Sequence, residues 1–338
     1  MRFSIITSTL ATALASALLM ATTPPVAAQT FTMKLSSPTN NDITSEWMKA
    51  MKAGVEGRSG GRIKVEGYPS NQLGQLPRAV EGVSLGTIEL TISAIGFYVG
   101  MEPRFEAFEV PGIFDDMKHA LRTIADPEIK KRFANLGASR GIEPLWIGVQ
   151  APLALISSKP VRSLADLKGQ KLRTPGATPI HIEPMRRLGV SPLSMGLGEV
   201  LPAIQNRTID GAMASLNVFT VFKYHDAAKA VTTIPKGYLV FAGMANRAWL
   251  KSLGPELEAI VREEALKAEA LNTTFGIDDY DRAIKIWESN GGQLITLPPA
   301  DVTRYIEEVR IAVEPILAKQ PQVKADYEAL LAAANRLR

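Results

Sequence analysis

The sequence predicts an α/β protein with two lobes and one long helix that spans both of them. Strand-like and helix-like segments alternate along most of the chain, as expected for strands connected by crossover helices. One uninterrupted helical segment, residues 255–288, is longer than a single small domain needs. The length of 338 residues leaves room for about two domains. A content of 46% hydrophobic and 21% charged residues is typical of a folded globular chain.

The N-terminal residues have the features of a secretory signal peptide. Arg2 provides a positive start, residues 3–21 carry no charge, and Val26 and Ala28 satisfy the small-residue rule for cleavage. A transmembrane anchor is the alternative, since the apolar stretch is about long enough to cross a bilayer. Its many Ser, Thr and Ala residues and the cleavage site favour removal instead. We therefore expect cleavage near Ala28, export across the inner membrane, and a mature chain that starts at Gln29.

The first part of the mature chain alternates between strands and helices. Ile43, Trp47, Met51 and Val55, for example, recur at roughly helical spacing. The strands are expected at 31–37, after a turn within 59–69, at 87–93 and at 142–149, and the helices at 42–56, 75–85 and around 116–136.

A second set of alternating segments begins near residue 150. Here Gly189 gives a helix its C-terminal stop, and a short strand ends at Arg173. Strands are expected at 152–158, before Arg173, at 190–195 and at the end of 197–215, helices at 178–188 and at the start of 197–215, and extended chain at 229–249.

The long helix begins at Gly254-Pro255, because proline is well placed in a first helical turn. It can run to Glu288, a length of about 50 Å, with a bend near Gly276. The segment 300–338 predicts two more helices, interrupted at Pro315 and Pro321.

These features predict how the chain divides. Residues 1–28 are the signal peptide, residues 29–148 with about 241–275 form lobe I, and residues 149–240 with about 276–338 form lobe II. Ligands of α/β lobes bind at the carboxyl ends of the strands, and two such lobes close on a ligand by hinge motion.

Composition excludes several functional classes. The chain has no cysteine, which excludes disulfide frameworks, thiol nucleophiles and cysteine-based metal sites. The three histidines, His119, His181 and His225, lack zinc-hydrolase spacing, and Asp115-Asp116 is better read as a helix start than as a metal site. The net charge is +4 with no basic tail, so no nucleic-acid partner is expected. We predict no catalytic residues, no metal and no cofactor.

Several segments of the mature chain follow one shared set of sequence patterns, in the same order. They are 60–75 (GGRIKVEGYPSNQLGQ), 83–93 (VSLGTIELTIS), 108–120 (FEVPGIFDDMKHA), 157–175 (SSKPVRSLADLKGQKLRTP) and 198–212 (GEVLPAIQNRTIDGA). In them the chain resembles the periplasmic solute-binding subunit of TRAP transporters, the DctP-type family. The resemblance implies a periplasmic binding protein that clamps a small organic acid between two lobes and delivers it to the small and large membrane permease subunits. We expect a monomer.

The resemblance places the family's ligand-binding arginine on Arg173. A guanidinium is a planar fork of donors that pairs bidentately with a carboxylate. Arg173 ends a predicted strand and precedes Thr174-Pro175-Gly176, where an α/β cleft is expected. An ordinary surface or structural ion pair is the alternative, and the surrounding family pattern favours the ligand role.

Other positions depart from the family pattern. Gln150 stands shortly after Trp146, where many members have a second arginine, and Met213, Ala214 and Ser215 stand where many have Glu-Asn. With fewer charged anchors, we expect a monocarboxylate with a less polar or aromatic body. The alternative is a shifted alignment, in which Asn217 takes the asparagine role. Gln150, Met213, Ser215 and Asn217 are therefore all candidate ligand contacts.

Weaker candidates lie in loops after the strands of lobe I. These are the loop 37–41, Gln72, and the segment Ser93–Tyr98, in which Phe97 and Tyr98 could stack on a ligand or simply pack. Trp146 is expected to pack near the cleft. His181, on the helix after Arg173, could face the ligand, or it could have a surface or N-terminal-turn role, which is favoured. His119 and His225 are expected at the surface.

Two other functions stay open. A periplasmic receptor that delivers its ligand to a sensor would use the same fold. A carboxylate-based hydrolase is a less favoured reading, because the sequence has no GxSxG, P-loop or GxGxxG motif.

Overall fold

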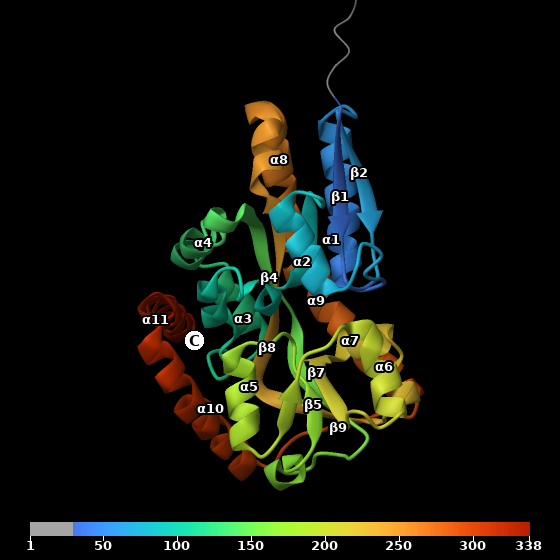
Figure 1. Cartoon of the computed structure of the whole chain (residues 1–338), viewed down its shortest axis with the longest axis vertical. Helices are drawn as coiled ribbons and strands as arrows, with labels where there is room; N and C mark the ends of the chain where they lie inside the picture. Colours follow the sequence, from blue (N-terminus) through green and yellow to red (C-terminus); the bar gives the residue numbers. More distant parts are fainter. Residues whose placement is uncertain (1–29) are drawn as a thin grey trace, which may run out of the picture.

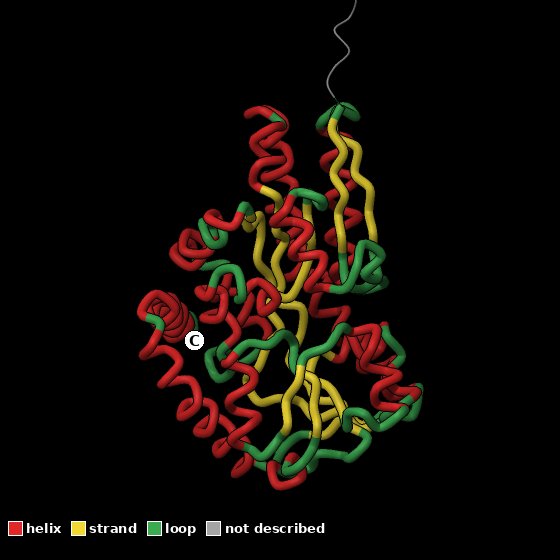
Figure 2. The backbone as a smooth tube through the Cα atoms, in the orientation of Figure 1, coloured by secondary structure: helices red, strands yellow, loops and turns green. Residues whose placement is uncertain are grey.

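The computed structural model describes residues 30–338, so the predicted signal peptide lies outside the described residues (Figure 1). These residues form a nine-stranded sheet with strand order β2-β1-β3-β8-β4-β7-β5-β6, and β9 pairs with β8. Helices surround the sheet (Figure 2). Within residues 30–338, no helix is long and apolar enough to span a bilayer.

One end of the sheet is built from the first segments of the chain. Strand β1 (Phe31–Ser36) lies between β2 (Ile63–Tyr68) and β3 (Leu90–Ala94), and both pairings are parallel. The alternation of strand and helix predicts this arrangement, because parallel neighbours need a crossover. The crossovers are α1 (Ile43–Arg58), which buries Trp47 and Met51, and α2 (Leu76–Leu85).

The centre of the sheet consists of two long antiparallel strands, β4 (Ile142–Ser157) and β8 (Ala230–Asn246). The expected division of β4 into 142–149 and 152–158 is wrong, because the strand is continuous. Its register with β8 shifts at three places, which lets Pro144 and Pro152 sit in the strand. Both long strands run through the middle of the molecule (Figure 1), where β8 pairs with β3 and β4 pairs with β7.

The other end of the sheet holds β5 (Lys171–Arg173), β6 (Ser191–Leu193), β7 (Gly211–Ser215) and β9 (Gln293–Ile295). Strand β5 is parallel to both β6 and β7. The helices here are α5 (Pro179–Arg187), α6 (Leu197–Gln205) and α7 (Leu216–Val221).

The predicted long helix is confirmed as α9 (Gly254–Ser289), which has 36 residues and follows the short helix α8 (Arg247–Ser252). Helix α9 is uninterrupted at Gly276. It packs against α1, β4 and α7, and therefore touches elements at both ends of the sheet.

The remaining helices refine the sequence prediction. The single helix expected around 116–136 is two helices, α3 (Met117–Ile124) and α4 (Pro127–Phe133), because Pro127 begins a new one. Pro315 lies inside α10 (Pro299–Lys319) without ending it, whereas Pro321 begins α11 (Pro321–Arg336). The short 3₁₀ helices are η1 (Ile95–Tyr98), η2 (Pro103–Glu109), η3 (Ala138–Arg140), η4 (Leu164–Leu167) and η5 (Tyr224–Asp226).

We use lobe I elements for β1–β3, α1–α4, η1 and η2, and lobe II elements for β5–β7 and α5–α7. Two clusters of buried hydrophobic residues fill the interior, and Phe97 packs against both of them. Neither cluster is confined to one lobe, since the first includes Leu172 of β5 and Ile180 of α5 and the second includes Leu76 of α2. Helix α10 packs on α5, but α11 packs on η2, α3 and α4. The predicted division gives α11 to lobe II, whereas its contacts in the structure are with lobe I elements. The lobe boundaries themselves stay a prediction.

Candidate functional site

Arg173 is a buried cation without a counterion. Its side chain is 1% exposed, and it is the only buried arginine or lysine among residues 30–338. Nε donates to the carbonyl oxygen of Met195 at 3.1 Å, and Nη1 donates to that of Met213 at 2.9 Å. No carboxylate in this part of the chain pairs with it, and burial lowers the pKa of Arg173 to about 10. A buried charge that lacks a partner is costly, so the site favours an anion.

Strand pairing places this guanidinium at the carboxyl end of parallel strands. Arg173 is the last residue of β5, opposite Leu193 of β6 and Ala212 of β7. The chain then turns at Gly176, whose φ of 77° favours glycine, and the hydroxyl of Thr174 donates to the carbonyl of Gly176 at 2.9 Å. The strand end is where ligands of α/β folds bind.

Met213 contacts Arg173 through its backbone. Its carbonyl accepts the hydrogen bond from Nη1, while the thioether side chain is 1% exposed within the hydrophobic core. The predicted contact of Met213 with a ligand stays a prediction.

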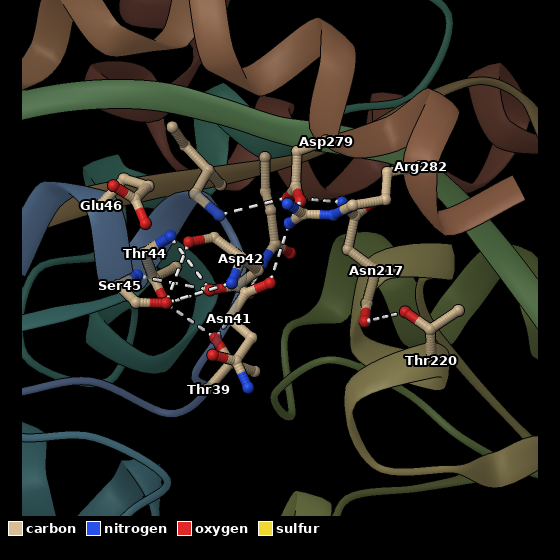
Figure 3. Close-up of polar contacts among 12 residues, drawn as sticks. Thr39, Asn41, Asp42, Thr44, Ser45, Glu46, Asn217, Thr220, Asp279 and Arg282 are labelled. Atoms are coloured by element: carbon tan, nitrogen blue, oxygen red, sulfur yellow. Dashed lines mark hydrogen bonds and ion pairs between the residues drawn. The ribbon is translucent and has the colours of Figure 1, made fainter. Parts of the chain in front are cut away.

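Gln150 bonds to Ser215 and to an aspartate from lobe I. The Ser215 hydroxyl donates to Gln150 Oε1 at 2.8 Å, and Gln150 Nε2 donates to Asp42 Oδ2 at 3.2 Å. Asp42 caps the N-terminus of α1 and also accepts from the hydroxyls of Thr39 and Thr44, each at 2.7 Å. We call Thr39, Asp42, Thr44, Gln150 and Ser215 the Asp42 network (Figure 3 shows its lobe I part). Burial raises the pKa of Asp42 to about 6.

Asn217 lies next to this network and bonds to the long helix. Its Nδ2 donates to Asp279 Oδ2 at 2.7 Å, and the backbone N–H of Ile43 donates to the same oxygen at 3.1 Å. Asp279 also pairs with Arg282, which donates to the carbonyl of Asn41 at 2.8 Å (Figure 3). Helix α9 is thereby tied to α1 of lobe I and to α7 of lobe II.

The lobe I candidates differ in exposure. Ser93 is buried and donates to the carbonyl of Ala94 at 3.2 Å, and Phe97 is half-buried between the two hydrophobic clusters. Tyr98 is fully buried against Phe105, with ring centroids 5.8 Å apart, and its hydroxyl has no partner among the described residues. Gln72 is exposed, and no side-chain hydrogen bond holds it in the described structure.

Trp146 packs as expected. Its ring meets that of Trp47 edge-on at 6.0 Å, and a Cβ at Gly243 would lie 2.1 Å from it, so only glycine fits at that position.

Two histidine predictions are wrong. His119 and His225 are buried at 2% and 8% exposure rather than at the surface. His119 Nε2 lies 2.9 Å from the carbonyl of Ala334, an interaction too distant along the chain for local patterns to reveal. Asp116 does cap α3, as expected of a helix start. Across residues 30–338, no three His, Cys, Asp or Glu side chains are grouped as metal ligands.

Sequence patterns did not identify Asp42 or Asp279 as residues of the site. The loop 37–41 was expected to line the site, and the residue that follows this loop, Asp42, is the one that bonds to Gln150. An aspartate at a helix N-cap is common, and nothing local indicates that Asp42 reaches Gln150 across the molecule.

A model of the family described as "Bacterial extracellular solute-binding protein, family 7" (DctP) matches residues 36–320. The match covers most of the chain. The chain belongs to the DctP family. It is accordingly a TRAP-type periplasmic solute-binding protein, which is a receptor and not an enzyme, as the sequence predicted.

Two relatives show the range within the DctP family. The chain is 29% identical over 311 residues to the C4-dicarboxylate-binding periplasmic protein DctP of Rhodobacter capsulatus, covering 90% of this chain and 89% of the relative. It is 26% identical over 243 residues to the 2,3-diketo-L-gulonate-binding periplasmic protein YiaO of Escherichia coli K12, covering 72% and 74%.

A solved structure shows the same fold. The TRAP periplasmic solute-binding protein of Anaerococcus prevotii DSM 20548, which has bound α/β-D-glucuronate, superposes with a TM-score of 0.85 at 22% identity. The superposition covers 91% of this chain and 99% of the other.

Proposed function

We propose that this protein captures a small organic acid between its lobes, with Arg173 as the carboxylate anchor, and delivers it to the small and large subunits of a TRAP permease. The observation that carries the proposal is the burial of Arg173 without a counterion. Two of its five N–H donors bond to carbonyl oxygens, and Nη2 makes no bond within the described residues. A ligand carboxylate supplies both the missing charge and the missing acceptor.

The proposed ligand has one carboxylate. Arg173 is the single buried arginine or lysine among residues 30–338, so a second carboxylate would have no equivalent anchor there. Gln150, at the position of a second arginine in many relatives, already bonds to Asp42 and Ser215. The relatives support either class: 2,3-diketo-L-gulonate and D-glucuronate carry one carboxylate, whereas C4-dicarboxylates carry two. The expected body of the ligand is less polar or aromatic.

Closure follows from where the contacts lie. Arg173 belongs to lobe II, and the η1 loop of lobe I approaches the chain just after it, since a Cβ at Gly176 would lie 3.2 Å from the carbonyl oxygen of Gly96. A ligand held by both lobes favours the closed form, because contacts from both sides exist only there.

Thermal-shift titration of the purified protein tests this proposal. The panel contains D-glucuronate, orotate, benzoate and succinate, which separates sugar acids, aromatic monocarboxylates and a dicarboxylate. A true ligand raises Tm in proportion to the logarithm of its concentration. Arg173→Ala should weaken binding of that ligand by about 30- to 5,000-fold, since removing one partner of a buried charge pair costs about 2–5 kcal/mol.

Exposed Arg186, on the neighbouring helix α5, provides the matched control. Arg186→Ala should bind as the unchanged protein does. Full affinity in Arg173→Ala would overturn the anchor assignment, and a clear preference for succinate would overturn the single-carboxylate proposal.

A further inference from the structure

Glu109 is a buried carboxyl group that the proposed function does not use. It ends η2, its residue is 4% exposed, and neither carboxyl oxygen has a hydrogen-bond partner within the described part of the chain. The backbone of Gly96 lies directly against it: a Cβ at Gly96 would be 2.4 Å from Glu109 Oε2. An ionised carboxylate without hydrogen bonds is unfavourable in the protein interior, so burial favours the protonated, uncharged form of Glu109.

The nearest titratable group comes from lobe II. His181, on α5, is 4% exposed, and its Nδ1 lies 3.8 Å from Glu109 Oε2. The same nitrogen lies 3.1 Å from the hydroxyl of Thr178 and 3.3 Å from the carbonyl of Pro175. Glu109 and His181 are thus neighbours contributed by different lobes, and they are not hydrogen-bonded to each other.

The pair lies behind the closest approach of the two lobes. Gly96 of η1 contacts Gly176 of the loop after β5, and these glycines adjoin Glu109 and Pro175 respectively. Phe97, the next residue, packs against both hydrophobic clusters. Separation of the lobes at this point would expose both Glu109 and His181 to water.

We propose that Glu109 and His181 form a buried contact between the lobes, a clasp that closes with both side chains uncharged and therefore links closure to pH. The proposal rests on the proposed closure of the lobes but not on the identity of the ligand.

The other charged groups around the clasp either have partners of their own or also favour the uncharged forms of Glu109 and His181. Glu106, on the same 3₁₀ helix, accepts from the Ile180 N–H at 3.0 Å and from Gln320 at 3.4 Å, and its charge disfavours ionisation of Glu109. The positive charge of Arg173 lowers the pKa of His181. Charged groups on the neighbouring elements form ion pairs of their own, among them Arg104 of η2 with Asp326 of α11, Lys236 of β8 with Asp115, Arg186 with Glu183 of α5, and Arg187 of α5 with Glu308 of α10.

The sign of the pH effect follows from burial. Burial raises the pKa of Glu109 to about 8 and lowers the pKa of His181 to about 4. In an open form with ordinary pKa values of about 4.5 and 6.5, closure takes up a proton at Glu109 and releases one at His181. The two effects oppose each other below about pH 6.5. Above it only Glu109 contributes, so closure weakens as pH rises through about 8.

Distance measurements between spin labels test the clasp. The chain has no cysteine, so Lys49→Cys on α1 and Lys168→Cys, both exposed, accept one label in each lobe. Electron–electron double resonance then gives the closed fraction in a D-glucuronate titration at pH 6.5 and 8.5. The apparent affinity should fall on the order of tenfold between these pH values. Glu109→Gln should abolish the fall, and His181→Gln should keep it.

Two further variants serve as controls. Glu109→Met replaces the titratable carboxyl group with an apolar side chain and serves if Glu109→Gln fails to fold. Glu183→Gln, an exposed change on α5, should behave as the unchanged protein. An identical fall in Glu109→Gln, or none in the unchanged protein, would overturn the clasp.

Failure of D-glucuronate to close the unchanged protein at either pH would count against that ligand and not against the clasp. The ligand-free distances then decide. A larger closed fraction at pH 6.5 than at 8.5, lost in Glu109→Gln, supports the clasp, and equal fractions contradict it.

Discussion

Two buried polar centres of this protein differ in how their charges are satisfied. Arg173 has backbone carbonyls around it and no counterion, whereas Asp42 accepts hydrogen bonds from Thr39, Thr44 and Gln150. The Asp42 network joins lobe I to lobe II within the protein itself. The comparison teaches that burial of a charged side chain does not by itself mark a binding site. A charge without a counterion is the stronger indication, and of these two centres Arg173 is the one that has it.

The strongest test of this difference is the replacement of Arg173 by methionine. We expect Arg173→Met to weaken the carboxylate ligand by more than about 30-fold. The free energy of unfolding should stay within about 1 kcal/mol or rise, since an apolar side chain replaces an uncompensated charge. Thermal-shift titration and urea unfolding measure the two quantities. Parallel losses of stability and affinity would mean that Arg173 is a structural residue.

The matching change in the other centre is Asp42→Ala. It removes the cap of α1 and leaves Gln150 Nε2 and two hydroxyls without their acceptor. We expect the free energy of unfolding to fall by about 2–3 kcal/mol. Urea unfolding measures this loss. Ser45→Ala alters the same capping box but keeps the carboxylate, so it should lower the free energy of unfolding by less. An equal loss would contradict the role of Asp42 as the acceptor that holds the network together.

The pH dependence of stability separates the centres further. The pKa of Asp42 is raised to about 6, so its contribution to stability is fully present below the ordinary pKa and is lost as pH rises through about 6. The unchanged protein should therefore lose about 2 kcal/mol relative to Asp42→Asn between pH 4 and 7. Urea unfolding across this range measures it. A constant difference between the two proteins would contradict the raised pKa.

Ser215→Ala should have a smaller effect. It removes the hydroxyl that donates to Gln150 Oε1, and we expect a loss of about 1 kcal/mol in the free energy of unfolding. If Ser215 instead contacts the ligand, as the sequence predicts, affinity in the thermal-shift titration will fall more than stability does.

The smallest effect is expected at Gln72, a predicted ligand contact that is exposed. Gln72→Ala should leave unfolding within about 0.5 kcal/mol. A tenfold loss of ligand affinity in the same titration would restore its predicted role.

Sequence patterns predicted the local elements and misjudged where they join. The alternation of segments gave β1, α1, β2, α2 and β3 with nearly their observed bounds. Two strands were expected at 142–149 and 152–158, whereas β4 is continuous, because shifts of register accommodate Pro144 and Pro152.

In the candidate site, too, local features were predictable and contacts between distant residues were not. Arg173 was predicted to end a strand and does so, since a three-residue strand and its turn are local. The partners of Gln150 and Asn217 were not predicted, because Asp42 and Asp279 are 108 and 62 residues away along the chain. Their predicted ligand contacts stay predictions.

The long strands β4 and β8 have a consequence for unfolding. Each strand contributes to the sheet at both ends of the molecule, and α9 packs along it. Neither end can therefore melt while the other keeps its hydrogen-bonded ladder intact. Heating in a calorimeter should give one cooperative transition, with equal calorimetric and van't Hoff enthalpies, instead of the two peaks of separable domains.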